Sequence, residues 1–424
     1  MKQETKRDVT PRLRFPEFRE EWAEVRLSQL ANSISDRVGT TPCIPYTVTS
    51  GMGLVSQQEK LGRTIAGNSL RNYIRLQKDD FAYNKSATKA YPEGYIARYL
   101  DEANAAVPNS IFTCFRVDRE KADPAYLDFL FSGNLHGRWL RKFLAIGARA
   151  HGSLNVSDDD LMALPVPLPS PPEQRKIADC LGSLDSLIAT EGRKLAALRD
   201  HKRGLMQQLF PQLGQTQPRL RFPEFRGKGE WSEHALIDIA TFRRGSFPQP
   251  YGLPEWYDEQ DGMPFIQVFD VGNDLRVKER TKSKISKLGA EKSVFIPNGT
   301  LIVTLQGSIG RVAITHYDAF IDRTLLIFET FLRPIEKSFF AYLIQNLFDL
   351  EKEKAPGGII KTITKEALSD FKVKIPKISE QQKIAVCLSS LDSLITAQAE
   401  KIESLKQHKR GLMQQLFPAP EGQE

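Results

Sequence analysis

The stretch EQRKIADCLGSLDSLIATEGRKLAALRDHKRGLMQQLFP, residues 173–211, decides the fold because it occurs a second time. The second copy, EQQKIAVCLSSLDSLITAQAEKIESLKQHKRGLMQQLFP, spans residues 380–418. The two copies are identical at about two thirds of their positions, and each residue lies 207 positions from its counterpart, as Glu173 does from Glu380. A repeat of this length indicates a duplicated structural unit. The sequence therefore predicts a molecule that contains one unit built twice.

Both copies carry apolar residues at the a and d positions of a heptad. Such a pattern, sustained over more than four heptads, predicts a helix that packs on another helix rather than on a globular core. At about 35 residues and 1.5 Å per residue, each helix would be ~50 Å long. The predicted interface residues are Ile177, Leu181, Leu184, Ile188, Glu191, Leu195, Leu198, Leu205, Leu209, Ile384, Leu388, Leu391, Ile395, Gln398, Ile402, Leu405, Leu412 and Leu416.

Polar residues interrupt this pattern at matching places in the two copies. Glu191 and Gln398 share a d position, and Lys202 and Lys409 share an a position. Because polar residues at such positions fix the register of a coiled coil, the matched interruptions favour pairing of the two copies with each other. The alternative is that each helix is buried separately in its own domain. The residues alone do not choose between parallel and antiparallel pairing, since Glu191 can lie near Gln398 in both.

Signals for the ends of these helices also occur twice. Ser170–Glu173 and Ser379–Gln382 fit a capping box, in which the first and fourth residues satisfy the free N–H groups of the first turn. Pro211 and Pro418 follow the last apolar residues, and proline cannot continue a helix. The repeat is therefore predicted to be helical from end to end.

Composition indicates a folded protein with an acidic partner. The chain has 424 residues, of which 41% are hydrophobic, and a formal net charge of +7. This content supports two or three packed domains, and the positive charge favours nucleic acid. No apolar run approaches 18 residues and the N-terminal residues lack an apolar core, so neither a membrane segment nor a signal peptide is expected. The four cysteines form no CxxC pair, which suits a reduced cytoplasm without a zinc site.

The segments between the repeats predict two α/β domains. Each opens on PRLRFPEF, at residues 11–18 and 218–225, and continues through about 130 residues of strand-like runs broken by Gly, Pro, Asn and Asp. We expect each domain to hold a twisted, mostly antiparallel sheet. The interiors of the two domains align poorly with each other. The helices expected within them span residues 25–31, 125–144, 235–240 and 337–352.

The motifs PRLRFPEF, PPEQRKIA or SEQQKIA, and HKRGLMQQLFP follow one another twice, and this pattern resembles the specificity subunit of type I restriction–modification systems. The resemblance implies an α/β (α+β) fold in which two target-recognition domains with twisted mixed sheets are separated by an antiparallel two-helix coiled coil. The domains would span residues 1–169 and 218–376. The conserved spacer helices, with their linker and tail, would span residues 170–217 and 377–424.

The same resemblance implies a function. Each recognition domain would read one half of a bipartite, asymmetric target in double-stranded DNA, and the coiled coil would set the spacer between the halves. Two modification (methyltransferase) subunits would dock on the helices, and restriction subunits with translocase activity would complete the assembly. The chain itself would be cytoplasmic and would not contact a membrane.

In the first domain, the segment 84–91 combines amide, hydroxyl, ammonium and aromatic groups, which suit hydrogen bonds to base edges and anchoring on phosphates. A solvated polar hairpin is the alternative interpretation. A second candidate, residues 149–153, is a basic loop that could equally be a plain glycine turn. The residues predicted to bind DNA are Asn84, Lys85, Ser86, Lys89, Tyr91, Arg149, His151 and Ser153.

In the second domain, the segments 242–248 and 306–311 carry the corresponding chemistry. A glutamine can read an adenine edge with two hydrogen bonds, and an arginine can read guanine or hold a phosphate. Glycines in these segments allow close approach of the backbone to DNA, or simply make a turn. The residues predicted to bind DNA are Arg243, Arg244, Ser246, Gln306, Ser308, Arg311 and Lys361.

Enzyme motifs are absent from the sequence. A DNA amino-methyltransferase needs a glycine-rich AdoMet loop and an Asn/Asp-Pro-Pro-aromatic motif, and an ATPase needs GxxxxGK[ST]; none of these occurs. We therefore expect a non-catalytic subunit that binds no metal or cofactor, with AdoMet, ATP and Mg²⁺ held by partner subunits. The alternative function is a coiled-coil adaptor whose two domains bind proteins.

Overall fold

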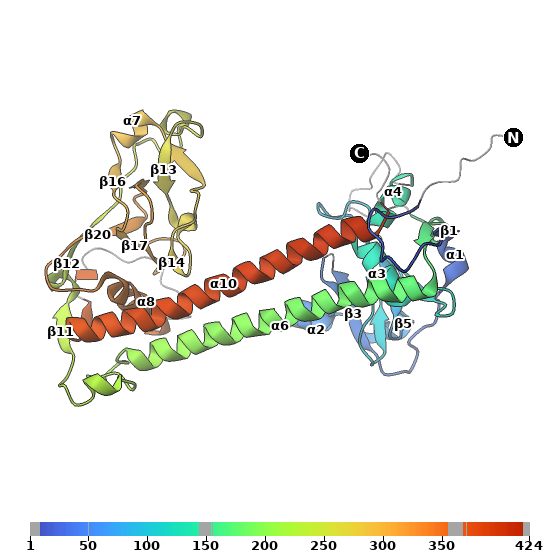
Figure 1. Ribbon diagram of the computed structural model, residues 1–424, viewed down its shortest axis with the longest axis horizontal. Coiled ribbons are helices and arrows are strands. Elements are labelled where there is room, and N and C mark those ends of the chain that lie inside the picture. Colours follow the sequence, from blue (N-terminus) through green and yellow to red (C-terminus); the bar gives the residue numbers. More distant parts are fainter. Residues whose placement is uncertain are drawn as a thin grey trace. The chain divides into compact units, whose positions relative to one another are not determined.

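The computed structural model describes residues 9–49, 51–143, 154, 156–354, 368–369 and 371–418 (Figure 1). The chain divides into two compact units, residues 1–191 with 401–424 and residues 192–400. Each unit contains one α/β head together with the beginning of one long helix and the end of the other. We refer to the α/β parts as head 1, within residues 9–168, and head 2, within residues 218–376.

The described residues of head 1 form three sheets. A four-stranded antiparallel sheet has the order β2-β9-β6-β7, and a second has the order β4-β3-β8-β5 with β3 and β8 parallel. A two-stranded sheet of β1 and β10 joins the start of the head to its end. The strands are β1 (Ala23–Arg26), β2 (Ala31–Ser33), β3 (Ile44–Thr49), β4 (Gly53–Ser56), β5 (Ile74–Leu76), β6 (Asp80–Asn84), β7 (Tyr95–Arg98), β8 (Ala105–Val107), β9 (Phe112–Val117) and β10 (Pro165–Leu168).

Head 2 repeats this topology strand for strand. Its sheets have the orders β12-β20-β17-β18-β14 and β15-β13-β19-β16, with β13 and β19 parallel, and a two-stranded sheet of β11 and β21. Strand β14 is an addition to the pattern of head 1. The strands are β11 (Ser232–Ala235), β12 (Ala240–Arg244), β13 (Met263–Ile266), β14 (Leu275–Arg276), β15 (Ser283–Ile285), β16 (Val294–Ile296), β17 (Leu301–Thr304), β18 (Val312–Ile314), β19 (Ala319–Ile321), β20 (Leu325–Phe331) and β21 (Lys372–Ile375).

The two heads therefore share a fold although their interiors align poorly in sequence. Strands require only an alternating or continuous apolar pattern, which many sequences satisfy. The expected mostly antiparallel pairing is confirmed, with β3–β8, β13–β19 and β14–β18 as the parallel pairs among the described strands. The expectation of one sheet in each head is wrong, because each head divides its strands between separate sheets.

Both heads also contain helices, and most of these are short. The predicted helix 337–352 is confirmed, but the predicted helix 125–144 is divided at Gly133, because Asn134 has a left-handed backbone with φ 59°. The predicted helices 25–31 and 235–240 are confirmed only in their central residues, as the short helix α1 and the 3-10 helix η3, because strands occupy the residues at both of their ends. The helices are α1 (Leu27–Leu30), α2 (Gln57–Leu61), η1 (Gly67–Asn72), α3 (Pro124–Ser132), α4 (Leu135–Arg141), α5 (Asp158–Met162), η2 (Pro223–Phe225), η3 (Leu236–Asp238), η4 (Pro254–Trp256), η5 (Val268–Asp270), α7 (Lys287–Ala290) and α8 (Lys337–Lys354).

The repeated stretch forms the long helices α6 (Pro171–Leu209) and α10 (Ile378–Leu416), coloured green and red in Figure 1. Each helix begins in one unit and ends in the other. The predicted interface residues are all buried or half-buried, whereas Leu187 and Leu394, outside the heptad pattern, are exposed. The predicted helix–helix pairing is therefore confirmed.

Ion pairs between the helices establish an antiparallel direction within each unit. In unit 1, Lys409 of α10 pairs with Asp185 of α6 at 2.6 Å. In unit 2, Lys202 of α6 pairs with Asp392 of α10 at 2.6 Å. Each pair joins a residue early in one helix to a residue late in the other, as only antiparallel helices allow. The two pairs are repeat equivalents, because both members differ by 207 positions.

The start of each long helix is anchored in its head by the dipeptide Glu-Gln. In unit 1, Arg14 donates two hydrogen bonds to the Glu173 carboxylate, at 2.9 and 2.7 Å, and Trp22 donates a third at 3.2 Å. Gln174 accepts from the Asp123 N–H at 2.8 Å. The predicted capping box is therefore wrong at Glu173, because its buried carboxylate accepts hydrogen bonds from the half-buried Arg14 instead. In α10, Ser379 lies inside the helix rather than at its cap.

Unit 2 repeats this anchor. Arg221 donates to both oxygens of Glu380, at 2.8 and 2.7 Å, and Gln381 accepts from the Glu336 N–H at 2.9 Å. The helix ends then complete the cores: Leu416 and Phe417 are buried in the core of head 1, and Leu209 and Phe210 in that of head 2. Each hydrophobic core thus combines residues from both repeats. None of the described helices is long and apolar enough to span a membrane.

Candidate nucleic-acid interface

Two of the predicted DNA-binding segments, residues 84–91 of head 1 and residues 306–311 of head 2, occupy the same topological position. Residues 85–94 join β6 to β7 in head 1, and residues 305–311 join β17 to β18 in head 2. Both loops leave the sheet through an equivalent backbone bond, from Lys85 N–H to Ile111 at 3.1 Å and from Leu305 N–H to Thr324 at 2.9 Å. We call these segments the hairpin loops. One fold thus presents two loops of different length and chemistry at one place.

A buried polar side chain at the end of the preceding strand holds each hairpin loop. The Asn84 amide donates to the Val48 carbonyl at 3.2 Å and accepts from the Ser86 N–H at 2.9 Å. Its register equivalent, Thr304, accepts from the Arg311 N–H at 2.9 Å. Asn84, which the sequence suggested as a DNA contact, therefore uses its amide to shape the loop.

The rest of the first hairpin loop is more open. Lys89 is exposed, Ser86 and Tyr91 are half-buried, and the Tyr91 ring lies edge-on to Tyr95 with centroids 4.8 Å apart. Lys85 is tied down by Asp158, with Nζ 3.1 Å from the carboxylate.

Asp158 organises the base of this loop. It accepts from the Thr113 hydroxyl at 2.7 Å as well as from Lys85. Burial by itself raises the pKa of Asp158, but the hydrogen bonds from Thr113 and Lys85 outweigh burial, and the pKa lies below its ordinary value. The carboxylate is therefore ionised at neutral pH and pairs with the Lys85 ammonium.

The second predicted segment of head 1 lies outside the described residues, as do Arg149, His151 and Ser153 within it. Lys361 of head 2 also lies outside them. Leu154, the first described residue after residues 149–153, donates its N–H to the Lys85 carbonyl at 2.7 Å. The chain therefore returns from that segment to the hairpin loop.

In head 2 the structure brings the two predicted segments to one edge. Gln306 and Ser308 are exposed in the hairpin loop, and Arg311, half-buried, donates to the Val271 carbonyl at 3.3 Å. The segment after β12 reaches the same edge, because the Gly245 N–H bonds to Leu325 at 3.0 Å. At the end of β12, Arg243 is exposed and Arg244 is half-buried. In the segment that follows, the half-buried Ser246 donates to the Lys292 carbonyl at 3.2 Å.

One further arginine was missed by the sequence reasoning. Arg323 lies in the turn between β19 and β20 and is exposed next to Thr324, the residue bonded to Leu305. The only sequence signal would have been an Asp-Arg-Thr turn between two apolar strands, which is common on protein surfaces.

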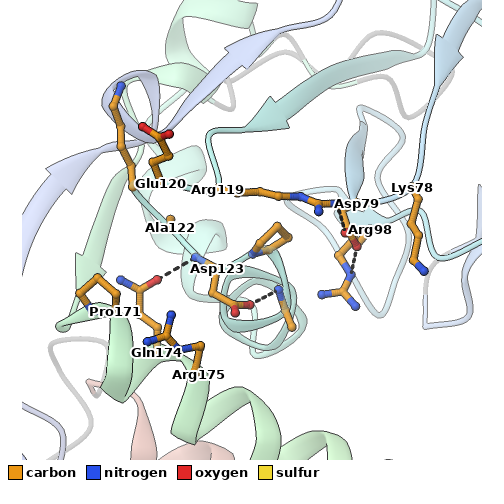
Figure 2. Close-up of a pocket in the computed structure, with 13 residues that line it drawn as sticks. Lys78, Asp79, Arg98, Arg119, Glu120, Ala122, Asp123, Pro171, Gln174 and Arg175 are labelled. Carbon is orange, nitrogen blue, oxygen red and sulfur yellow. Dashed lines mark hydrogen bonds and ion pairs between the residues drawn. The ribbon is translucent and has the colours of Figure 1, made fainter.

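A cavity of about 440 Å³ lies at the other end of the β6–β7 hairpin of head 1 (Figure 2). Two of its arginines pair with one carboxylate: Arg98 with Asp79 at 3.5 Å, and Arg119 with the same Asp79 at 2.5 Å. Asp123, also in the wall, caps α3 through the Ala125 N–H at 2.7 Å. Asp79 lies directly before β6, whereas the hairpin loop lies directly after β6. The cavity and the candidate interface are therefore at opposite ends of this strand. Among the described residues no cluster of His, Cys, Asp or Glu could hold a metal ion.

Comparison with known proteins identifies the family. The family model for the type I restriction modification DNA specificity domain matches residues 19–200 and again residues 228–407. A specificity subunit of Methanocaldococcus jannaschii, named for the type I restriction enzyme MjaX, is 23% identical over 325 residues, covering 76% of this chain and 74% of its own.

Solved structures of low identity show that the fold is shared. A structure of a type I R-M system, described for its complex assembly and conformational transition, matches with a TM-score of 0.57 and 20% identity, covering 94% of this chain and 97% of its own. The type I restriction–modification S subunit from M. genitalium matches with a TM-score of 0.56 and 16% identity, covering 97% and 100%. Because the two matches to the family model together cover far more than half of the sequence, the chain belongs to the type I restriction–modification DNA specificity family.

Proposed function

We propose that this chain is the sequence-specific DNA-binding subunit of a type I restriction–modification complex, and that each head reads one half of a bipartite, asymmetric target. One observation carries the proposal: a duplicated scaffold presents two heads of the same topology whose hairpin loops differ in length and in side chains. A common fold positions each loop, and unlike loops read unlike sequences. The long helices then set the interval between the two half-sites.

The surface of the helices supports docking of two partners. Leu187 on α6 and Leu394 on α10 are repeat equivalents, and their exposed fractions are 40% and 55%. A single exposed leucine is ordinary on a protein surface, so the support lies in its recurrence at equivalent positions, as one modification subunit per unit would require. In this assignment the partners hold AdoMet, ATP and Mg²⁺, and restriction subunits add to the complex. The chain contributes DNA recognition and no catalytic group.

Salt dependence separates DNA recognition from the alternative of a protein-binding adaptor. If Lys89, Arg243 and other cations of the interface neutralise phosphates, the logarithm of the DNA association constant should fall with the logarithm of the salt concentration, with a slope of about −0.9 per phosphate contacted. The measurement is fluorescence anisotropy of a labelled duplex across a salt series, with the chain assembled with its modification subunits. The same complex carrying Lys89→Ala and Arg243→Ala is measured beside it, and a slope that these two changes leave unaltered would favour the adaptor.

Variants of one hairpin loop should change one half-site only. Gln306→Ala with Ser308→Ala is expected to relax the half-site read by head 2, and Lys89→Ala with Tyr91→Ala the half-site read by head 1. Loss of a good base contact costs about 1–3 kcal/mol of discrimination, which corresponds to roughly 5- to 150-fold in preference. The measurement is binding to duplexes that carry substitutions in each half-site.

The matched control for these loop variants is Lys121→Ala. This lysine is exposed and pairs with Asp118 at 3.2 Å, in the segment after β9 that borders the cavity of Figure 2. It should leave both half-sites unchanged. Relaxation of both half-sites by variants of a single loop would contradict the assignment of one head to one half-site.

A further inference from the structure

Beside the hairpin loop of head 2, two exposed aromatic rings each have a cationic side chain over one face. Tyr251 is 48% exposed, and the Arg323 guanidinium lies 5.5 Å from the centroid of its ring. Phe269 is 40% exposed, and Lys282 Nζ lies 4.7 Å from the centroid of its ring. We call these four residues the aromatic–cation rim. Arginine over an aromatic face is held by cation–π attraction, so its orientation is set before any partner arrives.

A buried polar network fixes the rim. The Gln267 amide, on a residue only 8% exposed, donates to the Tyr251 hydroxyl at 2.9 Å. The Gln267 N–H in turn donates to the Asp270 carboxylate at 2.9 Å, and Lys282 N–H donates to the same carboxylate at 3.0 Å. Asp270 is fully buried, and Phe269 precedes it directly in η5. One buried carboxylate therefore positions the backbone that carries Phe269 and Lys282, and it also holds Gln267, whose side chain bonds to the Tyr251 hydroxyl.

The rim borders the hairpin loop on two sides. On one side Gly307 packs on Val268, the first residue of η5, where an added Cβ would lie 3.4 Å from the valine side chain. On the other side the Leu305 N–H bonds to Thr324, next to Arg323. Gln306, exposed at this edge, lies between these two contacts along the chain.

The position of Arg323 differs between the two heads in the way that a specificity determinant should. The bonds from Leu305 to Thr324 and from Lys85 to Ile111 are equivalent in the two heads. Arg323 and Ser110 each precede the acceptor residue, so they occupy equivalent positions in head 2 and head 1. Both side chains are exposed. The shared fold thus presents a long forked cation in one head and a short hydroxyl in the other at one topological position.

We propose that Arg323, held over Tyr251, is a specificity-determining residue of head 2 that reads a guanine in its half-site; this rests on the proposed function. The planar guanidinium can donate two parallel hydrogen bonds to guanine O6 and N7, a pairing that no other base offers. The Tyr251 ring acts through Arg323 as a positioning residue.

The test uses the complete complex. Cells that carry the chain with its modification subunits are mapped for methylated motifs, and purified complex is tested on duplexes that vary each half-site. Arg323→Ala should reduce the preference for guanine at one position of one half-site by about tenfold or more. Arg323→Lys should lose the same preference, because an ammonium lacks the fork, while affinity for DNA is largely retained.

Variants of the ring isolate its role. Tyr251→Phe keeps the aromatic face but loses the hydroxyl that Gln267 holds, so it should weaken the preference less than Tyr251→Ala, which should relax the same position as Arg323→Ala. The matched control is Arg333→Ala, an exposed arginine beyond the far end of β20 that donates to the Asp238 carbonyl at 3.3 Å. This control should leave the motif unchanged.

The other possible results also distinguish between the proposal and its alternatives. An unchanged motif with Arg323→Ala overturns the proposal, and so does an equal loss of affinity for every sequence, which would mark a phosphate contact. If the alanine variant also loses the other half-site, it has misfolded, and the charge-preserving Arg323→Lys variant decides. Should the unaltered complex methylate no bipartite motif, the proposed function itself fails, which is a distinct result.

Discussion

Inserting one heptad into both long helices is expected to move methylation to a target whose unread spacer is about three base pairs longer. The residues 185–191 would be duplicated after Glu191 and the residues 394–400 after Glu400. Seven residues add about 10 Å of helix at 1.5 Å per residue, and each base pair occupies about 3.4 Å. The Lys401 ammonium pairs with Glu191, so the two insertions enter the coiled coil at one level and preserve its heptad pattern.

Genome-wide mapping of methylated sites would measure this change, with the original target as an internal reference. Both half-sites should be retained while the interval between them grows, and methylation at the original spacing should be lost. Insertion into α6 alone is the control, because it shifts one side of the interface against the other and should abolish recognition. A spacer that stays unchanged with both insertions would contradict the role of the helices as a ruler.

Replacing Glu173 by alanine is expected to destabilise unit 1 by about 3–5 kcal/mol, since the change leaves a charge unpaired in a largely buried site. The Glu173 side chain is 1% exposed, and its partner Arg14 is 16% exposed. The variant would also remove the acceptor of the Trp22 N–H. Urea unfolding followed by hydrogen exchange of unit 1 would measure the loss, because a chain with two units need not unfold in a single step.

Lys176→Ala is the matched control for this experiment. Lys176 lies on the same turn of α6 and pairs with Glu17, but both side chains are about half exposed, at 52% and 50%. Exposed ion pairs contribute roughly 0–1 kcal/mol, so this variant should be nearly neutral. If the two variants were equally stable, the buried arginine–glutamate pair would not be what anchors α6 in head 1.

The scaffold could be predicted from the sequence because its signals are local and occur twice. The heptad pattern gave the interface residues, and proline gave the end of each helix, since both depend on neighbours within one or two turns. The antiparallel direction could not be derived from the heptad itself, because a polar d position is compatible with both directions. It depends on ion pairs such as Lys202 with Asp392, whose members lie 190 residues apart.

The candidate interface was predictable in part. Loop composition pointed to residues 84–91 and 306–311, but nothing in the sequence showed that these loops are equivalent, because unlike strands can build the same sheet. The role of Asn84 also depended on tertiary structure, since its acceptor Val48 belongs to another sheet. For Arg323, a charged residue in a turn is ordinarily just solvated surface, and only the placement of Tyr251 beside it distinguishes it.

By itself, then, the sequence determined that one unit is built twice and that two long helices pair, because a repeat and a heptad are read from the chain alone. Only the tertiary structure decided that each core is closed by a helix end from the other repeat, and that two heads of unlike sequence share one topology. The physical reason is that these features depend on contacts between residues far apart in the chain, which local patterns permit without specifying.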